Sequence, residues 1–413
     1  MATTDTKDKK HAVILSGGGA NGAYEVGVLK ALCAGMSPAT DYKPLDPYVF
    51  SGTSVGAYNA AYLVSHWKEY GPSVIANLEQ LWIDEISTRL SRCGNSMFRL
   101  RGDPREYLNP ACYFPNPLQP LSYFVQDTAT LSWEFLQRSV QFATDQEASI
   151  VERVASLFNF SSFVSINPLD RLVRETIDYA NIRAAAAKHL CITATNWSLG
   201  EAESFSNHEM TDDLGPAIVK ASASIPGFLP IQYVGAQPYV DGGVLLNTPL
   251  LPAIQAEANV LHVITLNPQL RKIRRPELSN TLETAWRQQV VAWVAAIEKG
   301  LKEVWYINLN RELAQEGLKR LKASASNEPL GLEATLQKYV KDYKSVEVYL
   351  YRPGSDLGGP LGLLDFDRDR LQRLIERGFS DAVNYRKIAP TEAWENPTYI
   401  PDLPLTYQTE QHM

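Results

Sequence analysis

The sequence predicts an α/β fold with a largely parallel central sheet. Strand-like runs alternate with helix-like runs through the first two-thirds of the chain, which is typical of a parallel sheet with helices on both faces. The chain opens with such a unit, in which an apolar run leads through a glycine loop into a helical pattern (HAVILSGGGANGAYEVGVLKAL, residues 11–32). The chain has 413 residues, 45% of them apolar and 21% charged, as expected of a globular protein with a large core.

Hydrophobic periodicity places the individual elements. Strands are expected at residues 12–15, 48–50, 189–195, 201–206, 239–240, 260–266 and 346–351. Helices are expected at residues 23–34 and 55–65, and another begins at Asn167 with an inner stripe of Leu169, Leu172, Val173 and Ile177. Helical spacing of apolar residues from Leu282 to about Leu321 predicts one or two long amphipathic helices.

The same patterns divide the chain into segments. We expect a disordered tail at residues 1–10, a catalytic core at 11–270, a mostly helical part packed on the core at 271–387, and an extended tail at 388–413. Within the core, residues 93–160 are predicted to form an irregular and partly helical insertion, which is a candidate cap over a pocket. Its first part, up to residue 125, is rich in Pro, Arg and aromatic residues.

Charge and apolar content exclude several classes of protein. The net charge of −7 argues against a nucleic-acid binder. No apolar stretch approaches the roughly 20 residues that cross a bilayer, and no secretory signal is visible. Cys33, Cys93, Cys112 and Cys191 are widely scattered, which favours free buried thiols over a metal site. The prediction is a cytoplasmic protein, with peripheral contact to membranes as one option, and with no metal or cofactor.

The glycine loop has two interpretations. Written as Gly17-x-Gly19-x-x-Gly22, it matches the dinucleotide fingerprint. A dinucleotide site also needs an acidic residue at the end of the second strand, about 20 residues later. Asp41 and Asp46 instead precede that strand. A nucleotide-binding domain therefore stays open only as an alternative.

The second strand leads into the pentapeptide Gly52-Thr53-Ser54-Val55-Gly56, a G-x-S-x-G sequence. Between a strand and a helix this pattern indicates a nucleophile elbow, with Ser54 at its apex and small residues at the flanking positions. The N-terminus of the following helix favours a developing negative charge. The glycine loop is then better explained as a cradle for an oxyanion, because glycine lets backbone N–H groups approach a substrate closely.

The serine needs a proton acceptor, and two residues qualify. The order Ser54, Asp241, His262 matches that of the α/β-hydrolases, but His262 lies inside an apolar strand, where a core histidine is the better interpretation. Asp241 stands at a strand end and is followed by Gly242 and Gly243, which let a second backbone or a substrate approach. Asp241 is the preferred base.

With these residues in place, the chain resembles the patatin-like phospholipase family, whose members are serine lipid acyl hydrolases with a Ser–Asp dyad. The matches stand in order over residues 11 to about 267: the glycine loop, the elbow, the stretch KASASIPGFLP at 220–230, the Asp241-Gly242-Gly243 turn, and Asn247-Thr248-Pro249.

The resemblance implies a three-layer α/β/α fold, a helical C-terminal extension and a two-step mechanism. Ser54 would attack a fatty-acyl ester while Asp241 takes its proton, and water would then hydrolyse the acyl-enzyme. Asp241 would have to be partly desolvated to act as a base. The oxyanion would be held by N–H groups of Gly17, Gly18, Gly19 and Ala20 with Val55, and the motif is supported by Asn21, Gly22, Gly52, Gly56, Gly242 and Gly243. The implied substrate is a lipid or membrane surface.

Two positions depart from the family. The family usually carries Arg or Lys where Asn21 stands, and often Asp where Ser16 stands. The alternative function is therefore a catalytically weak regulatory or interaction protein on the same scaffold, which would need an activator. Candidate partners are an activator or a second copy of the chain.

Overall fold

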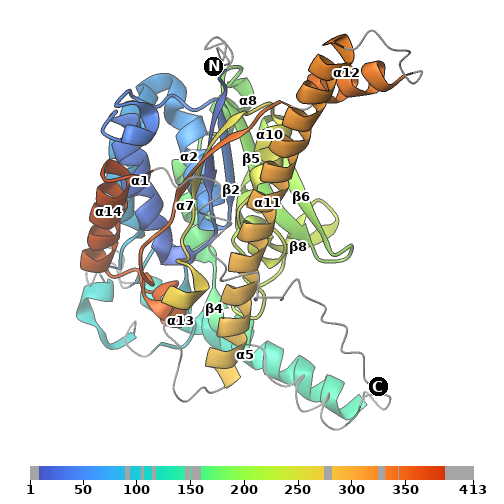
Figure 1. Cartoon of the computed structure of the whole chain (residues 1–413). Helices are drawn as coiled ribbons and strands as arrows, with labels where there is room; N and C mark the ends of the chain where they lie inside the picture. The colour runs from blue at the N-terminus through green and yellow to red at the C-terminus, as the bar shows by residue number, and fades with distance from the viewer. Residues whose placement is uncertain are drawn as a thin grey trace, which may run out of the picture.

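A central sheet of eight strands organises the chain in the computed structural model (Figure 1). The structure describes residues 9–88, 94–103, 107–113, 118–144, 149, 160–273, 281–323, 331–342 and 344–386. The sheet order is β10-β9-β1-β2-β5-β8-β7, with β6 paired to β5. The pairs from β10 through β5 are parallel, whereas β5 with β6, β5 with β8 and β7 with β8 are antiparallel.

Except for the strand at residues 232–234, which was not predicted, the strands of the main sheet lie close to their predicted positions. Those of the main sheet are β1 (His11–Leu15), β2 (Val49–Thr53), β5 (His189–Asn196), β6 (Glu201–Ser206), β7 (Gln232–Val234), β8 (Gln237–Asp241), β9 (Val260–Ile264) and β10 (Glu347–Tyr351). A separate antiparallel pair is formed by β3 (Arg99–Leu100) and β4 (Val164–Ser165). The predicted α/β fold with a mostly parallel sheet is confirmed.

Helices fill most of the rest. They are α1 (Ala23–Cys33), α2 (Val55–Tyr70), α3 (Val74–Leu81), α5 (Gln119–Thr144), α7 (Asn167–Thr176), α8 (Tyr179–Ala184), α9 (Leu214–Ser222), α10 (Leu250–Gln255), α11 (Thr281–Ala323), α12 (Leu332–Asp342), α13 (Gly359–Gly362) and α14 (Arg368–Val383). The predicted long amphipathic region is one continuous helix, α11. In the segment 93–125, predicted without clear order, α5 begins at Gln119.

Strand β1 separates two hydrophobic cores because its side chains alternate between the faces of the sheet. Val13 and Leu15 join the larger core with residues of α1, α2 and α14. Ala12 and Ile14 join the second core, to which α10 and α11 contribute. The two helix layers stand on opposite sides of the sheet in Figure 1, as the predicted three-layer fold requires.

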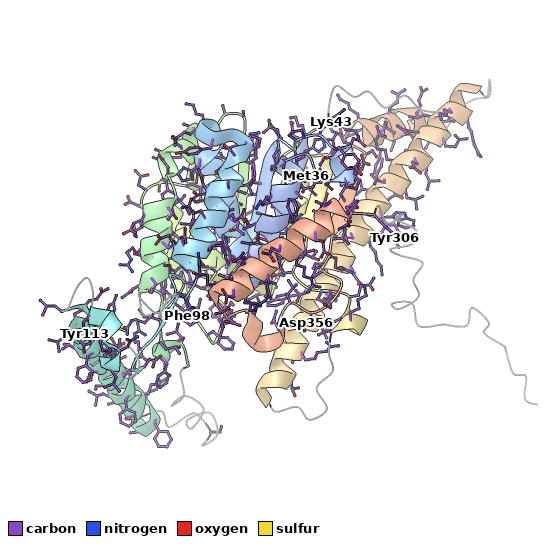
Figure 2. All side chains as sticks on the ribbon, turned by 90° about the vertical axis from the view of Figure 1, so that its left-hand side faces the viewer. Met36, Lys43, Phe98, Tyr113, Tyr306 and Asp356 are labelled. Atoms are coloured by element: carbon purple, nitrogen blue, oxygen red, sulfur yellow. The ribbon has the colours of Figure 1, made fainter. Side chains whose placement is uncertain are left out.

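The C-terminal part is built into both layers and into the sheet itself. Strand β10 extends the parallel sheet at its edge, and α14 packs along α1. Figure 2 shows α14 lying across that side of the molecule. The backbones of α1 and α14 approach closely at Gly27, where a Cβ would lie only 1.9 Å from the carbonyl oxygen of Ile375. The predicted tails lie almost entirely outside the described residues, and the segment boundaries stay predictions.

Two further predictions have outcomes here. Cys33 and Cys191 are buried free thiols, as predicted, but Cys112 is disulfide-bonded. The prediction that all four cysteines are free thiols was therefore wrong, because spacing along the chain does not reveal which cysteines meet in space. In the part of the chain that the structure describes, no helix is long and apolar enough to cross a membrane.

Candidate active site

Ser54 stands at the turn between β2 and α2, in a backbone conformation that few residues adopt. Its φ is 57° and its ψ is −125°, which for a residue other than glycine costs on the order of 1–3 kcal/mol. The turn is tight, since a Cβ on Gly52 would lie 2.2 Å from the carbonyl oxygen of Gly56. Strain of this kind is typical of a side chain that the fold holds for a function.

The stretch 220–230 connects Ser54 to Asp241. The backbone N–H of Ser54 donates to the hydroxyl of Ser222 at 2.9 Å, and that hydroxyl donates to the carbonyl oxygen of Thr193 at 2.6 Å. Two residues later, the carbonyl oxygen of Ser224 accepts from the N–H of Asp241 at 2.8 Å. One short segment therefore fixes the backbones of both candidate dyad residues.

Asp241 ends β8, and its carboxyl is buried beside Ser54. Oδ1 accepts from the N–H of Gly243 at 2.6 Å. Oδ2 is buried and makes no hydrogen bond to any residue that the structure describes. Burial raises the pKa of Asp241 to about 7, although the N–H of Gly243 and the nearby hydroxyl of Ser54 act to lower it. A carboxyl with this pKa is part ionised at neutral pH, as a general base should be.

The turn after Asp241 is held from two sides. Trp293 of α11 donates from its indole nitrogen to the carbonyl oxygen of Gly243 at 2.6 Å. Asn247 makes two hydrogen bonds to the glycine loop. Its side-chain amide donates to the carbonyl oxygen of Gly17 at 3.2 Å, and its backbone carbonyl oxygen accepts from the N–H of Gly17 at 3.1 Å. A Cβ on Gly17 would lie 3.0 Å from the Cβ of Ser54. The glycine loop, the serine and the aspartate thus form one buried cluster.

The N–H groups of the glycine loop are not equivalent. Gly17 donates to Asn247, as above, and Ala20 donates to the carbonyl oxygen of Leu363 at 2.8 Å. Among the described residues, the N–H groups of Gly18, Gly19 and Val55 make no hydrogen bond. Three donors at the rim of the serine turn are therefore available to a ligand, one of them at the N-terminus of α2.

A cation reaches the glycine loop from the C-terminal part of the chain. Arg370 of α14 donates from Nη2 to the side-chain oxygen of Asn21 at 2.6 Å and to the carbonyl oxygen of Leu357 at 2.7 Å. Its Nη1 donates to the carbonyl oxygen of Asp365 at 2.7 Å. Gly19 has a φ of +53°, and a Cβ there would lie 2.3 Å from the carbonyl oxygen of Leu363. We call residues 357–370 the clamp segment, because it touches the loop at Gly19, Ala20 and Asn21.

Two other residues considered from the sequence lie in the core. His262 is fully buried, its ring nitrogens face His11 and Tyr351 at 3.1 Å each, and burial lowers its pKa to about 3. It is the core histidine that its strand predicted. Ser16 is buried too, and its hydroxyl contacts that of Thr248 and the carbonyl oxygen of Ile264.

Features of a nucleotide or metal site are few in the described residues. The carboxylate of Asp46 contacts Lys188 and the indole nitrogen of Trp67. No group of three or more His, Cys, Asp or Glu side chains that could hold a metal was found among the described residues.

Sequence reasoning did not single out Ser222, Asn247, Trp293 or Arg370 as parts of the site. Ser222 lies in the stretch 220–230 and Asn247 in the sequence Asn247-Thr248-Pro249, so the motif matches did indicate both regions. Trp293 and Arg370 stand in α11 and α14, where only helical periodicity was visible.

Comparison with known proteins gives one informative match. A sequence model described as patatin-like phospholipase matches residues 13–254. Among proteins with curated descriptions, no sequence matches this chain. Among solved structures, the crystal structure of VipD from Legionella pneumophila aligns at 15% sequence identity over 89% of this chain and 67% of that chain. Its TM-score of 0.32 is too low to support an argument about function.

Proposed function

The chain belongs to the patatin-like phospholipase family, and from that premise we propose that it cleaves fatty-acyl esters with Ser54 as nucleophile and Asp241 as general base. The observation that carries the proposal is the strained elbow of Ser54 beside a buried carboxyl whose Oδ2 makes no hydrogen bond to any residue that the structure describes. Family membership implies a lipid acyl hydrolase, and the assignment of the dyad is ours.

In the first step, the hydroxyl of Ser54 attacks the ester carbonyl carbon while Asp241 accepts its proton. The tetrahedral intermediate places its negative oxygen at the N–H groups of Gly18, Gly19 and Val55, the three donors left available. Gly17 and Ala20, also predicted as donors, would instead hold the loop in shape, since their N–H groups already bond Asn247 and Leu363. Collapse of the intermediate transfers the proton to the leaving alcohol.

In the second step, water attacks the acyl-enzyme. Asp241 accepts a proton from the water, and the same three N–H groups hold the second oxyanion. Release of the fatty acid returns the proton to Ser54. Both steps need Asp241 ionised at the start, and its pKa of about 7 places that condition near neutral pH.

The contact of Arg370 with Asn21 supports an active site over a decayed one. The regulatory alternative rests on the missing cation at position 21. Here a guanidinium bonded to the side chain of Asn21 lies at the same loop. It would favour negative charge there and hold the loop in place.

The test is hydrolysis of a soluble p-nitrophenyl butyrate ester and of phospholipid vesicles by the wild type and three variants. Ser54→Ala and Asp241→Asn should each lower kcat by about 10³-fold or more, with the fold retained, because each removes one member of a unit that acts together. Ser198→Ala, at an exposed turn, is the matched control and should keep full activity. Hydrolysis retained by either dyad variant would refute the dyad.

A further inference from the structure

Helix α5 places its charges inward and its apolar side chains outward. Its only charged residues are Asp127, Glu134 and Arg138. They are spaced by seven and four positions, so they share one face. That face is the protected one: the side chains of Asp127, Arg138 and Glu134 are 4%, 26% and 34% exposed. A helix on the surface of a soluble protein normally has the opposite arrangement.

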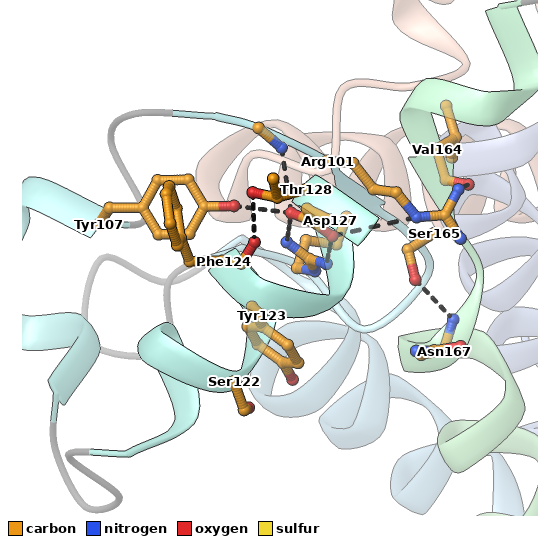
Figure 3. Close-up of polar contacts among 12 residues, drawn as sticks. Arg101, Tyr107, Ser122, Tyr123, Phe124, Asp127, Thr128, Val164, Ser165 and Asn167 are labelled. Atoms are coloured by element: carbon orange, nitrogen blue, oxygen red, sulfur yellow. Dashed lines mark hydrogen bonds and ion pairs between the residues drawn. The ribbon is translucent and has the colours of Figure 1, made fainter. Parts of the chain in front are cut away.

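The inward face is tied down at Asp127. Arg99 of β3 donates to both carboxylate oxygens, at 2.5 and 2.8 Å, and the hydroxyl of Tyr107 and the N–H of Gly102 add bonds at 2.6 and 3.0 Å. Figure 3 shows this network around Asp127, with Arg101 close by. A buried carboxylate with this many donors is fully satisfied, so the base of the helix has a defined orientation.

The remaining charges of α5 neutralise each other. Glu134 and Arg138 form an ion pair at 3.2 Å on successive turns. With Asp127 paired to Arg99, every charged side chain of the helix has an opposite partner. The helix therefore presents no unpaired charge.

The outward face consists of large apolar side chains. Seven of them are each more than half exposed and define the outer face of α5: Leu121, Phe124, Val125, Trp133, Phe135, Leu136 and Val140. Phe135 is the most exposed, at 72%. Large apolar side chains exposed along one helix mark an interaction site, because leaving them in water is unfavourable.

The helix leaves the body at the end of the sheet where the site lies. In Figure 1, α5 extends from the end opposite the N-terminus, the end at which β1 and β2 finish. Figure 2 shows the same projection from the side, next to Tyr113. The outer face of α5 therefore lies toward the same end of the molecule as the end of β2, the strand that Ser54 follows.

We propose that the outer face of α5 docks the protein onto the surface of a lipid aggregate made of zwitterionic or neutral lipids. This inference rests on the proposed function, which requires a substrate held in a lipid phase. Aromatic and aliphatic side chains without charge match the acyl boundary of such a surface. The one basic side chain of this helix, Arg138, is paired to Glu134, so the helix has no free cation to select anionic headgroups. A second copy of the chain is the competing occupant.

The test separates docking from chemistry. The Ser54→Ala chain is mixed with phosphatidylcholine vesicles and floated through a density gradient. We expect it to float, and its partition coefficient to change less than twofold between 0.05 and 0.5 M NaCl, because charge does not drive the contact. Adding Trp133→Gln, Phe135→Gln and Leu136→Gln should lower partition at least tenfold. The control changes Gln126, Gln137 and Gln141, all exposed on the flanking surface of α5, to Ser and should bind as before.

The same triple change in a chain with Ser54 intact should lower vesicle hydrolysis about tenfold and leave hydrolysis of soluble p-nitrophenyl butyrate unchanged. Equal flotation of the triple variant, or binding only to anionic vesicles, would overturn the docking proposal. So would a dimer of the Ser54→Ala chain that the triple change dissociates. If the wild type leaves the soluble ester intact, the proposed function fails, whereas flotation of the Ser54→Ala chain still reports on docking alone.

Discussion

At the scale of single residues, burial gives Asp241 the pKa of a base. An exposed Asp is a weak base, since its usual pKa lies near 4. Burial in the cluster with Ser54 raises this value to about 7, and Oδ2, which bonds none of the described residues, is available for a proton. Ionising the Asp241 carboxyl therefore destabilises the folded state, while the ionised carboxylate is the form that acts as a base. Activity and stability are for this reason expected to change in opposite directions with pH.

Activity should rise as the pH increases through about 7. If Asp241 is the base, the acid limb of kcat/KM against pH reports its ionisation in the free enzyme. We expect a single-proton limb with a midpoint near 7, measured on a soluble ester between pH 5 and 9. A midpoint near 4 would show that the base is an ordinary exposed carboxyl.

Stability should respond in the opposite direction. The folded state holds the proton of Asp241 up to about pH 7, whereas the unfolded chain releases it near pH 4, so the contribution of this group falls as the pH rises between those values. Three pKa units correspond to roughly 4 kcal/mol as an upper bound. Asp241→Asn should therefore be more stable than the wild type at pH 8 and lose most of this advantage by pH 4, as measured by urea unfolding.

The wild type must be compared with Asp241→Asn because the pKa of a second buried acid is raised as well. Burial also raises the pKa of Glu25 in α1, although a bond from Asn59 opposes the shift. Glu25 is present in both chains, so its contribution cancels. An equal pH dependence of stability in the two chains would rule out a raised pKa at Asp241.

At the scale of elements, α14 connects the fold to the glycine loop. It packs on α1, the helix that follows the loop, and its first turn carries Arg370 to Asn21. The clamp segment also accepts the N–H of Ala20 at Leu363. Movement of α14 would therefore change the aim of the N–H groups at Gly18 and Gly19.

Arg370→Ala should lower kcat about 10- to 100-fold with little change in KM, because a displaced oxyanion donor affects the transition state more than the bound substrate. Arg370→Lys restores a cation and should recover part of the loss. Arg373→Ala, an exposed position of the same helix, is the control. Steady-state kinetics on a soluble ester make the comparison, and equal kcat for the two alanine variants would remove Arg370 from the site.

At the scale of the whole molecule, the C-terminal part completes the domain that the family model matches. Ile297, Leu301 and Val304 of α11 are buried in the second core. Each contributes about 1.5–3 kcal/mol by its burial, and their sum is comparable with the net stability of about 5–15 kcal/mol that is typical of folded proteins. On the opposite face of the sheet, Leu371 and Ile375 of α14 are likewise buried in the larger core.

A chain that ends at residue 270 should therefore fail to fold, because it exposes one face of the sheet and the outer side of α1. The matched control ends at Arg386 and keeps every described element. Circular dichroism and thermal unfolding should show a cooperative transition for the longer chain only. A cooperative transition in the shorter chain would show that the matched region is independently stable.

The sequence by itself determined the fold class, most strands of the main sheet, the helices α1, α2, α7 and α11, and the elbow that carries Ser54. These follow from patterns local in the chain: strand and helix periodicity, a glycine loop and a G-x-S-x-G turn. Strand β10 was visible for the same reason, whereas its place at the edge of the sheet comes from the structure. Ser54 and Asp241 as a dyad remain predictions that these local motifs support.

Only the tertiary structure decided which N–H groups stay available, which residues hold them, and how buried Asp241 is. Arg370 and Asn21 are 349 positions apart in the chain, and Trp293 is 50 positions from Gly243. A sequence pattern of period two or 3.6 contains no information about such contacts, because packing between distant elements brings them together. The outward apolar face of α5 belongs here as well, since a helical stripe does not say which of its sides the protein covers.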